Sequence, residues 1–575
     1  MSNLQNRRLF PYIGITLIVL ISHGWLIFNQ STNWDDWLIK GFLDDGNWSD
    51  LRNMTSEMGL PILAYFFWSL KLLGLSGSYK LVSLFLIYLS SLVTFEIGLR
   101  SGWLYRSEAL LIAVITAVYP AFQTSILLST LQYEFFYFLF LLAVLIYLIS
   151  AKEPPNSRLR FLLLGLSLIL FFVSFNLNSL LIYYFVFLIC LILNEDQVMG
   201  RACLHKLQFA IRYRMHFVVL PFVYWRMKEV LFPTHGLYAN YNRLEFKGTR
   251  LEFEENVGRV TEAIQVEVFT PVQAAIGYLS EFPIFPLLIF SASCAVYFIF
   301  LRKISREKVQ KLGKLKRLNI MLMISVVLLI CGIVPYAVVG HIPSRSGWDS
   351  RHAILVGLPV AILLTATIRW VYLTSTSQTQ LMRATLGVIT TFVGSILIVG
   401  FVISTASYYA AHQLRAIKDE SVMAKLQHQD SLKEFSVFWI DDRFFIAGGS
   451  THYNFYEWAS IFKTIWGGQS RVGIQLHYEG RLLPHVLPAK LFQTSRYNLA
   501  DFNPEGRQAC LTIQPGVPQF SESKLVQRYL LLQVQSWFGG EKYQAEKRAF
   551  LQEVTLVGVE ELRNADPLKG CLDIG

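Results

Sequence analysis

Two acidic residues stand side by side near the N-terminus, in the segment Asn33-Trp34-Asp35-Asp36-Trp37. They follow directly on a long apolar stretch and lie between two tryptophans. A positioned carboxylate can take the proton of an attacking hydroxyl, so this pair suits general-base chemistry. The alternative is an acidic loop beside the belt of aromatic residues that is common at membrane surfaces.

A third carboxylate, Glu134, begins another apolar stretch, which contains no other charged residue. Charged residues are costly in a bilayer and commonly mark function there. We expect Glu134 to act with Asp35 and Asp36. It would either orient the acceptor, the molecule that carries the attacking hydroxyl, or hold a divalent cation together with Asp36. The alternative is a carboxylate that only stabilises the N-terminus of its own helix.

Positive side chains gather in the short segment 341–352, which contains Arg345, Arg351 and His352. A guanidinium group binds phosphate oxygens through two parallel hydrogen bonds. Arg226, near the end of another apolar stretch, is expected to join them in a phosphate-binding site. An ion pair between Arg226 and Glu229 is the alternative.

The elements that position these residues are membrane-spanning helices. Of the 575 residues, 53% are hydrophobic and 16% are charged, against about 25% charged in an ordinary soluble domain. The apolar residues form blocks of roughly 17–25, enough for a helix to cross about 30 Å of hydrocarbon. The blocks predict a polytopic α-helical membrane protein with about eleven spans, at residues 10–29, 79–99, 107–123, 131–150, 159–176, 178–194, 215–232, 283–301, 318–340, 353–373 and 384–410.

The distribution of basic residues predicts the orientation of these spans. With the N-terminus in the cytoplasm, every inner connection is basic, as the positive-inside rule requires. The net charge of +11 is then explained by topology, so we expect no nucleic-acid partner. The first block is expected to be retained as a span of the plasma or inner membrane, rather than removed as a signal peptide. Residues 60–74 are expected to form an interfacial or re-entrant helix, although a further span is the alternative.

The chain is expected to divide into a membrane domain, residues 1–411, and a soluble extracytoplasmic α/β domain, residues 412–575. The membrane domain would present outer loops 30–78, 233–281 and 341–352. In the second domain we expect strands at 434–440 and 471–478, a helix at 453–466, and a further helix or strand within 522–540. Its role is expected to be contact with the acceptor or a partner, or capping of the site. Cys510 and Cys571, both in this domain, are compatible with a disulfide.

In the order of these features, the sequence resembles members of the GT-C superfamily, the membrane glycosyltransferases that use polyprenyl-phosphate sugars. Members have an acidic pair after the first span, as in Asp35-Asp36, and then an aromatic-rich amphipathic segment, as in residues 56–77. A basic inner turn follows, as in LRSGWLYR. The next span ends in a small residue, any residue and a proline, as in AVYPAF with Pro120. The closest similarity is to the branch that contains protein O-mannosyltransferases and the lipid A aminoarabinose transferase, in which a carboxylate recurs at the position of Glu134.

The resemblance implies a GT-C-like fold and an inverting transfer of a sugar from a polyprenyl-phosphate donor to a hydroxyl of a glycan, lipid or protein, at the outer face of the membrane. Asp35 or Asp36 would be the general base, and Arg345, Arg351, His352 and Arg226 would bind the donor phosphate. Neither the long loop 233–281 nor the C-terminal domain matches a named member, so the sugar stays open.

Other functions are also compatible with the sequence. A secondary transporter would show internal repeats and charges near the middle of the membrane, and we find no convincing repeat. A non-catalytic scaffold or assembly subunit would use the C-terminal domain for interactions and would tolerate substitution of the carboxylates. An oligosaccharide ligase or polymerase that uses polyprenyl carriers is the nearest alternative among enzymes.

Overall fold

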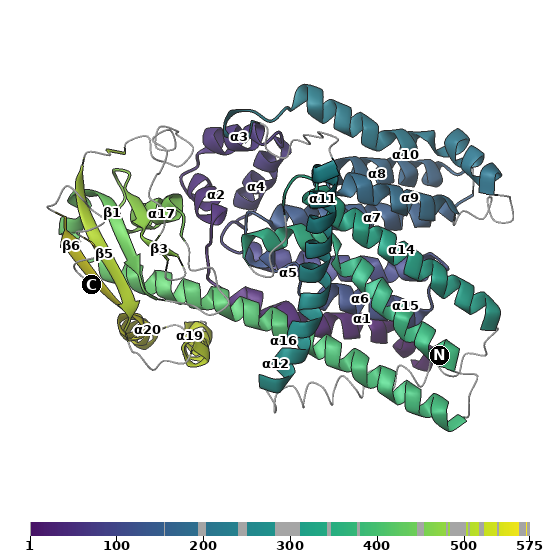
Figure 1. The fold of residues 1–575 in the computed structure, drawn as a ribbon. Helices are drawn as coiled ribbons and strands as arrows, with labels where there is room; N and C mark the ends of the chain where they lie inside the picture. The colour runs from purple at the N-terminus through teal and green to yellow at the C-terminus, as the bar shows by residue number, and fades with distance from the viewer. Residues whose placement is uncertain are drawn as a thin grey trace. The chain divides into compact units, whose positions relative to one another are not determined.

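The structure is a computed structural model that describes residues 2–154, 156–193, 203–239, 250–281, 311–341, 347–375, 380–444, 453–478, 481–482, 502–503, 506–516, 522–536, 540–562 and 571. The chain forms two compact units. Unit 1 comprises Met1–Trp25, Leu81–Ser125 and Thr130–Ala406, and unit 2 comprises Leu26–Lys80, Ile126–Ser129 and Ser407–Gly575. Each unit is described by itself below (Figure 1).

Unit 1 is built from helices. Their bounds are α1 (Ser2–His23), α5 (Tyr79–Arg100), α6 (Arg106–Val118), η2 (Thr124–Ile126), α7 (Leu131–Ala151), α8 (Arg158–Ser174), α9 (Leu180–Leu193), α10 (Cys203–Leu231), η3 (Gly236–Tyr238), α11 (Arg250–Ile264), η4 (Gln265–Phe269), α12 (Thr270–Glu281), α14 (Lys311–Ala337), η5 (Trp348–Leu355), α15 (Gly357–Ser375) and α16 (Gln380–Leu426). Three of them, α5, η2 and α16, continue into unit 2. Helix α7 packs along α8, and α15 packs against both α14 and α6.

Among the residues that the structure describes, six helices are long and apolar enough to cross a membrane, as expected for a polytopic membrane protein. They are Leu9–Phe28, Tyr79–Arg100, Leu131–Ala151, Leu315–Ala337, Gly357–Thr374 and Phe392–Leu426. Helices α6, α8 and α9 have 13, 17 and 14 residues. At a rise of about 1.5 Å per residue, they are roughly 20–26 Å long, shorter than the hydrocarbon core.

The count of eleven spans therefore stays a prediction. The expected span at 283–301 lies outside the described residues. Within residues 60–74, the structure forms α4 (Ile62–Leu72), which has 11 residues. At about 16 Å this helix is too short to cross a bilayer, in agreement with the expectation of a non-spanning helix.

Unit 2 combines short helices with a four-stranded sheet. The helices are η1 (Gly24–Phe28), which starts in unit 1, then α2 (Asp35–Asp44), α3 (Trp48–Glu57), α4, η6 (Asp430–Glu434), α17 (Phe455–Trp466), α19 (Glu522–Ser536) and α20 (Glu541–Val554). The sheet has the order β2-β1-β5-β6, formed by Val472–Gln475, Phe435–Asp442, Arg507–Pro515 and Thr555–Glu561. Strand β1 is parallel to β2 and β5, and β6 is antiparallel to β5. A short hairpin joins β3 (His477–Tyr478) and β4 (Arg481–Leu482).

The core of unit 2 lies between this sheet and helices α16, α17, α19 and α20. Phe438 and Ile440 of β1 are fully buried with Trp458 and Phe462 of α17 and Phe550 of α20. Strand β1 is buried along most of its length, because apolar residues occupy both of its faces. The strand expected at 434–440 and the helix expected at 453–466 are confirmed. The single strand expected at 471–478 is instead two short strands, β2 and β3, in different sheets.

Helix α17 also packs against α2, which carries the acidic pair. Asn454 caps the N-terminus of α17, and Glu457 returns a hydrogen bond to the Asn454 backbone N–H (2.9 Å). Elsewhere in the unit, Cys510 of β5 and Cys571 form a disulfide with a Cα–Cα distance of 5.4 Å.

Candidate functional site

The backbone that leads into α2 is strained. Trp34 has φ 48° and ψ −130°, a conformation that glycine adopts readily and that costs another residue of order 1–3 kcal/mol. Its N–H donates to Glu457 Oε2 of α17 (2.8 Å). Glu457 is fully buried and forms an ion pair with Arg415 of α16, which is also buried. A buried network of unit 2 thus holds the residue that precedes the acidic pair.

Asp36 is the buried member of the acidic pair, with 1% of its surface exposed. Its carboxylate accepts hydrogen bonds from Leu128 N (3.0 Å), Ser129 N (2.8 Å), Ser129 Oγ (2.7 Å) and, more weakly, Tyr79 Oη (3.4 Å). Burial raises the pKa of Asp36 to about 6, against the opposing effect of these hydrogen bonds and of Lys80. Because Asp36 lies in the first turn of α2, these hydrogen bonds hold the start of α2 against the segment 128–129.

Asp35 is half-buried and accepts a hydrogen bond from Tyr456 Oη of α17 (2.8 Å). Adjacent positions on a helix point about 100° apart, so the two carboxylates meet different surroundings. Asp35 is therefore the more accessible carboxylate of the pair.

Two buried cations of unit 2 were not expected from the sequence. The Lys80 ammonium, at the start of α5, donates to Asn29 O (2.9 Å) and Ser31 O (2.5 Å), and it interacts electrostatically with Asp36. Arg415 lies over the ring of Tyr453 at 4.0 Å. The sequence held a hint of each, because Lys80 stands at the start of a largely apolar span and Arg415 follows the last apolar block.

The same part of unit 2 contains buried polar atoms without a hydrogen-bond partner. Among the described residues, this holds for both amide atoms of Asn33 and both ring nitrogens of His412. The His412 ring packs against Trp34 (5.8 Å) and Tyr408 (4.5 Å). Buried polar groups normally find a partner in protein or water, so these atoms are positioned for water or for a polar ligand.

Glu134 belongs to unit 1, where it lies in the first turn of α7 and is 5% exposed. Within the described part of the chain, neither of its oxygens accepts a well-formed hydrogen bond. The Ser83 hydroxyl lies beside it but donates its proton to Ser125 O (2.7 Å). Glu134 is therefore a buried acidic group whose hydrogen-bonding capacity is not used inside unit 1.

The expected phosphate-binding residues that the structure describes also lie in unit 1. Arg351 is buried in η5, where it contacts the Trp348 ring (4.3 Å), donates to Trp348 O (3.0 Å) and pairs with Asp349 (3.1 Å). The neighbouring His352 packs between Tyr336 (4.6 Å) and His341 (5.0 Å). Burial, with Arg351 and His341 nearby, lowers the pKa of His352 to about 2, so this imidazole is neutral.

The other two expected phosphate-binding residues are Arg226 and Arg345. Arg226 is exposed and pairs with Glu229 (3.0 Å), which is the alternative weighed from the sequence. Arg345 lies outside the described residues. Asp35 and Asp36 thus share unit 2, whereas Glu134, Arg351, His352 and Arg226 belong to unit 1.

A divalent cation at Asp36 does not fit the local chemistry. Both Asp36 oxygens face N–H or O–H donors, which occupy the lone pairs that a metal ion would need. Among the described residues, no group of three or more His, Cys, Asp or Glu side chains is placed to hold a metal ion.

Comparisons with known proteins give one match. Neither a protein-family profile nor a curated protein matches the chain. Among solved structures, the chain is similar to ArnT from Cupriavidus metallidurans, a structure determined with bound undecaprenyl phosphate, at 10% sequence identity and a TM-score of 0.37, over 87% of this chain and 92% of that one. A similarity at this level does not establish a common fold, so no argument here rests on it.

Proposed function

We propose that the protein is an inverting glycosyltransferase that moves a sugar from a polyprenyl-phosphate donor to an acceptor hydroxyl at the extracytoplasmic face of the membrane. The observation that carries the proposal is the unequal pair of carboxylates after the first apolar helix. Asp36 is buried and anchored, and Asp35 is half-exposed on the same helical turn. The order of motifs along residues 5–195 supports the superfamily.

Asp35 is the general base in this proposal. It takes the proton from the acceptor hydroxyl as the oxygen attacks the anomeric carbon of the sugar. The bond between that carbon and the phosphate oxygen breaks, and its electron pair leaves with the polyprenyl phosphate. One displacement inverts the anomeric centre. Asp36 is a positioning residue, because its hydrogen bonds to the segment 128–129 hold the first turn of α2 in place.

The departing phosphate needs positive charge or hydrogen-bond donors. Arg351 and Arg345 remain the proposed phosphate-binding arginines, and Arg226 would have to exchange its ion pair with Glu229 to join them. His352 would act as a neutral hydrogen-bond donor, since burial lowers the pKa of this imidazole. In unit 2, Lys80 is a further candidate, because its ammonium already interacts with Asp36. Glu134 is the candidate for orienting the acceptor.

The test is turnover of radiolabelled polyprenyl-phosphate sugars by the purified protein. Asp35→Asn should lower kcat about 10²–10⁴-fold, the usual contribution of a general base, and leave donor binding unchanged. Asp44→Asn is the matched control, since Asp44 is an exposed carboxylate at the other end of the same helix. Arg351→Gln should weaken donor binding.

Two outcomes would contradict the proposal. Full turnover by Asp35→Asn would remove Asp35 as the base. Absence of donor binding by the intact protein, across a panel of polyprenyl-phosphate sugars, would favour a transporter or a non-catalytic scaffold. The acceptor would be found by supplying glycan, lipid and peptide hydroxyls in separate reactions.

A further inference from the structure

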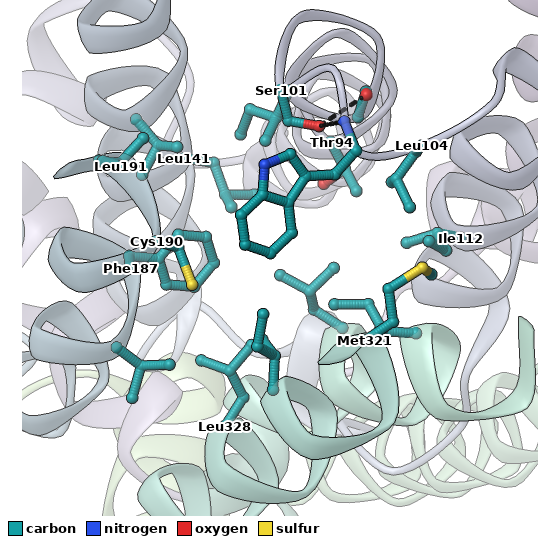
Figure 2. A pocket seen from close by; sticks show the side chains of 18 of the residues that line it. Thr94, Ser101, Leu104, Ile112, Leu141, Phe187, Cys190, Leu191, Met321 and Leu328 are labelled. Carbon is teal, nitrogen blue, oxygen red and sulfur yellow. Dashed lines mark hydrogen bonds between the residues drawn. The ribbon is translucent and has the colours of Figure 1, made fainter. Parts of the chain in front are cut away.

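An apolar cavity of about 140 Å³ lies among the helices of unit 1 (Figure 2). It is lined by side chains from α5, α6, α7, α9, α14 and α15 and from the turn between α5 and α6. Figure 2 shows Leu104, Ile112, Leu141, Phe187, Met321 and Leu328 around the space. An engineered cavity of about 150 Å³ in another protein takes up benzene, so this one has room for about six carbon atoms of a hydrocarbon chain.

A cluster of charged residues adjoins the cavity. Trp103 lines the cavity, and its backbone carbonyl accepts a hydrogen bond from Arg317 Nη1 of α14 (2.8 Å). Arg317 Nη2 also donates to Glu108 Oε1 (2.8 Å), and Arg369 Nε of α15 donates to the same oxygen (3.0 Å). Glu108 is 1% exposed. Two guanidinium groups share one carboxylate, which leaves one positive charge in excess beside an apolar space.

These two arginines have hydrogen-bonding capacity to spare. Arg317 Nε is buried and makes no hydrogen bond with any described residue. The only hydrogen bond of Arg369 to the described part of the chain is the one from Nε to Glu108. The planar guanidinium offers five N–H donors that match phosphate oxygens, so, as far as the described residues go, the cluster keeps N–H donors for an anion.

The arginines also lie at the right depth for a lipid headgroup. Arg317 is within the first turn of the apolar segment Leu315–Ala337, and Arg369 is within the last two turns of Gly357–Thr374. Basic pockets between membrane helices on the cytoplasmic side are a recurrent form of anionic-lipid site.

We propose that this cavity and the arginine pair form a binding site for an anionic phospholipid of the bilayer, with part of one acyl chain in the cavity and the phosphate at Arg317 and Arg369. Phospholipids surround the helices at far higher concentration than any polyprenyl carrier, so mass action favours them. The site does not depend on the glycosyl-transfer proposal, since Asp35 and Asp36 take no part in it.

The experiment is native mass spectrometry of the full chain in mild detergent, titrated with phosphatidylglycerol or phosphatidylcholine. We expect phosphatidylglycerol to bind more tightly, and Arg369→Gln to lower its affinity about fivefold. Arg100→Gln is the matched control, because Arg100 is a more exposed arginine of the same unit that pairs with Glu96. The affinity of this variant for phosphatidylglycerol should be unchanged. Val144→Phe, which adds a ring at the wall of the cavity, should also weaken binding.

Three results would overturn the site. They are equal binding of the two phospholipids, equal effects of Arg369→Gln and Arg100→Gln, and displacement of phosphatidylglycerol by polyprenyl phosphate at equal concentration. Thermal unfolding of each variant without added lipid separates loss of the site from loss of the fold. Should Arg369→Gln be unstable, Arg369→Lys keeps the charge but loses the planar fork, and it should bind with an intermediate affinity.

Discussion

Glu457 of α17 holds the strained entrance to the acidic helix, and replacing it with glutamine is the sharpest test of unit 2. Its carboxylate accepts from Trp34 N (2.8 Å) and Asn454 N (2.9 Å) and pairs with Arg415 (2.5 Å). Burial raises the pKa of Glu457, whereas Arg415 lowers it. The variant Glu457→Gln keeps the shape of the side chain, removes its charge and replaces one of the two accepting oxygens with an NH2 donor.

The expected loss of stability comes from the Arg415 charge, which stays buried without its carboxylate partner. The side chains of Arg415 and Glu457 are 2% and 0% exposed, and removing one partner of a buried ion pair costs about 3–5 kcal/mol. In a protein unit of about 150–250 residues, each kcal/mol lowers Tm by roughly 2–4 °C. We therefore expect Tm to fall by about 6–20 °C. Since Trp34 precedes Asp35, turnover should fall as well.

The assay is thermal unfolding of the purified protein, followed by intrinsic fluorescence, for Glu457→Gln, Arg415→Gln and the double variant. The two positions are in contact, so their effects should not add, and the double variant should lose less stability than the sum of the single variants. Additivity to within about 0.5 kcal/mol would refute the idea that Glu457 and Arg415 stabilise the unit as an ion pair. Lys463→Gln serves as a control, since its ion pair with Asp45 is about 40% exposed on both sides and should contribute less than about 1 kcal/mol.

Three further perturbations test other parts of the structure. Burial raises the pKa of Asp36 in the folded state to about 6, above the ordinary aspartate value of about 3.9. Because ionisation then costs more in the folded state, the free energy of unfolding should fall by about 3 kcal/mol as the pH rises from about 4 to 6. Asp36→Asn should remove this slope, and an unchanged pH profile of Tm would contradict it. The disulfide of Cys510 closes a separation of 61 residues, so Cys510→Ser should cost about 4 kcal/mol, seen as a lower Tm that reducing agent reproduces in the wild type. Gly400→Ala should destabilise unit 1, because the added Cβ would lie 2.4 Å from Ala275 O; Gly165→Ala meets nothing within 4 Å and should be neutral or slightly stabilising, so similar Tm values for the two would contradict the packing.

The sequence alone identified features that depend on local composition. Apolar length predicts spans, so helices were expected correctly around residues 10–29, 79–99 and 131–150. Helical and strand periodicity placed α17 and β1 to within two residues. The ion pair of Arg226 with Glu229 was also foreseeable as an alternative, because residues three apart on a helix are neighbours.

The different surroundings of Asp35 and Asp36 could not be read from the sequence. Their partners are distant along the chain, with Ser129 at a separation of 93 residues and Tyr456 at 421. The buried cations Lys80 and Arg415 owe their roles to similarly long-range contacts. The sequence established that two carboxylates follow the first apolar helix. Only the tertiary structure decided which of them is buried, because burial and hydrogen bonding come from segments that the chain brings together on folding.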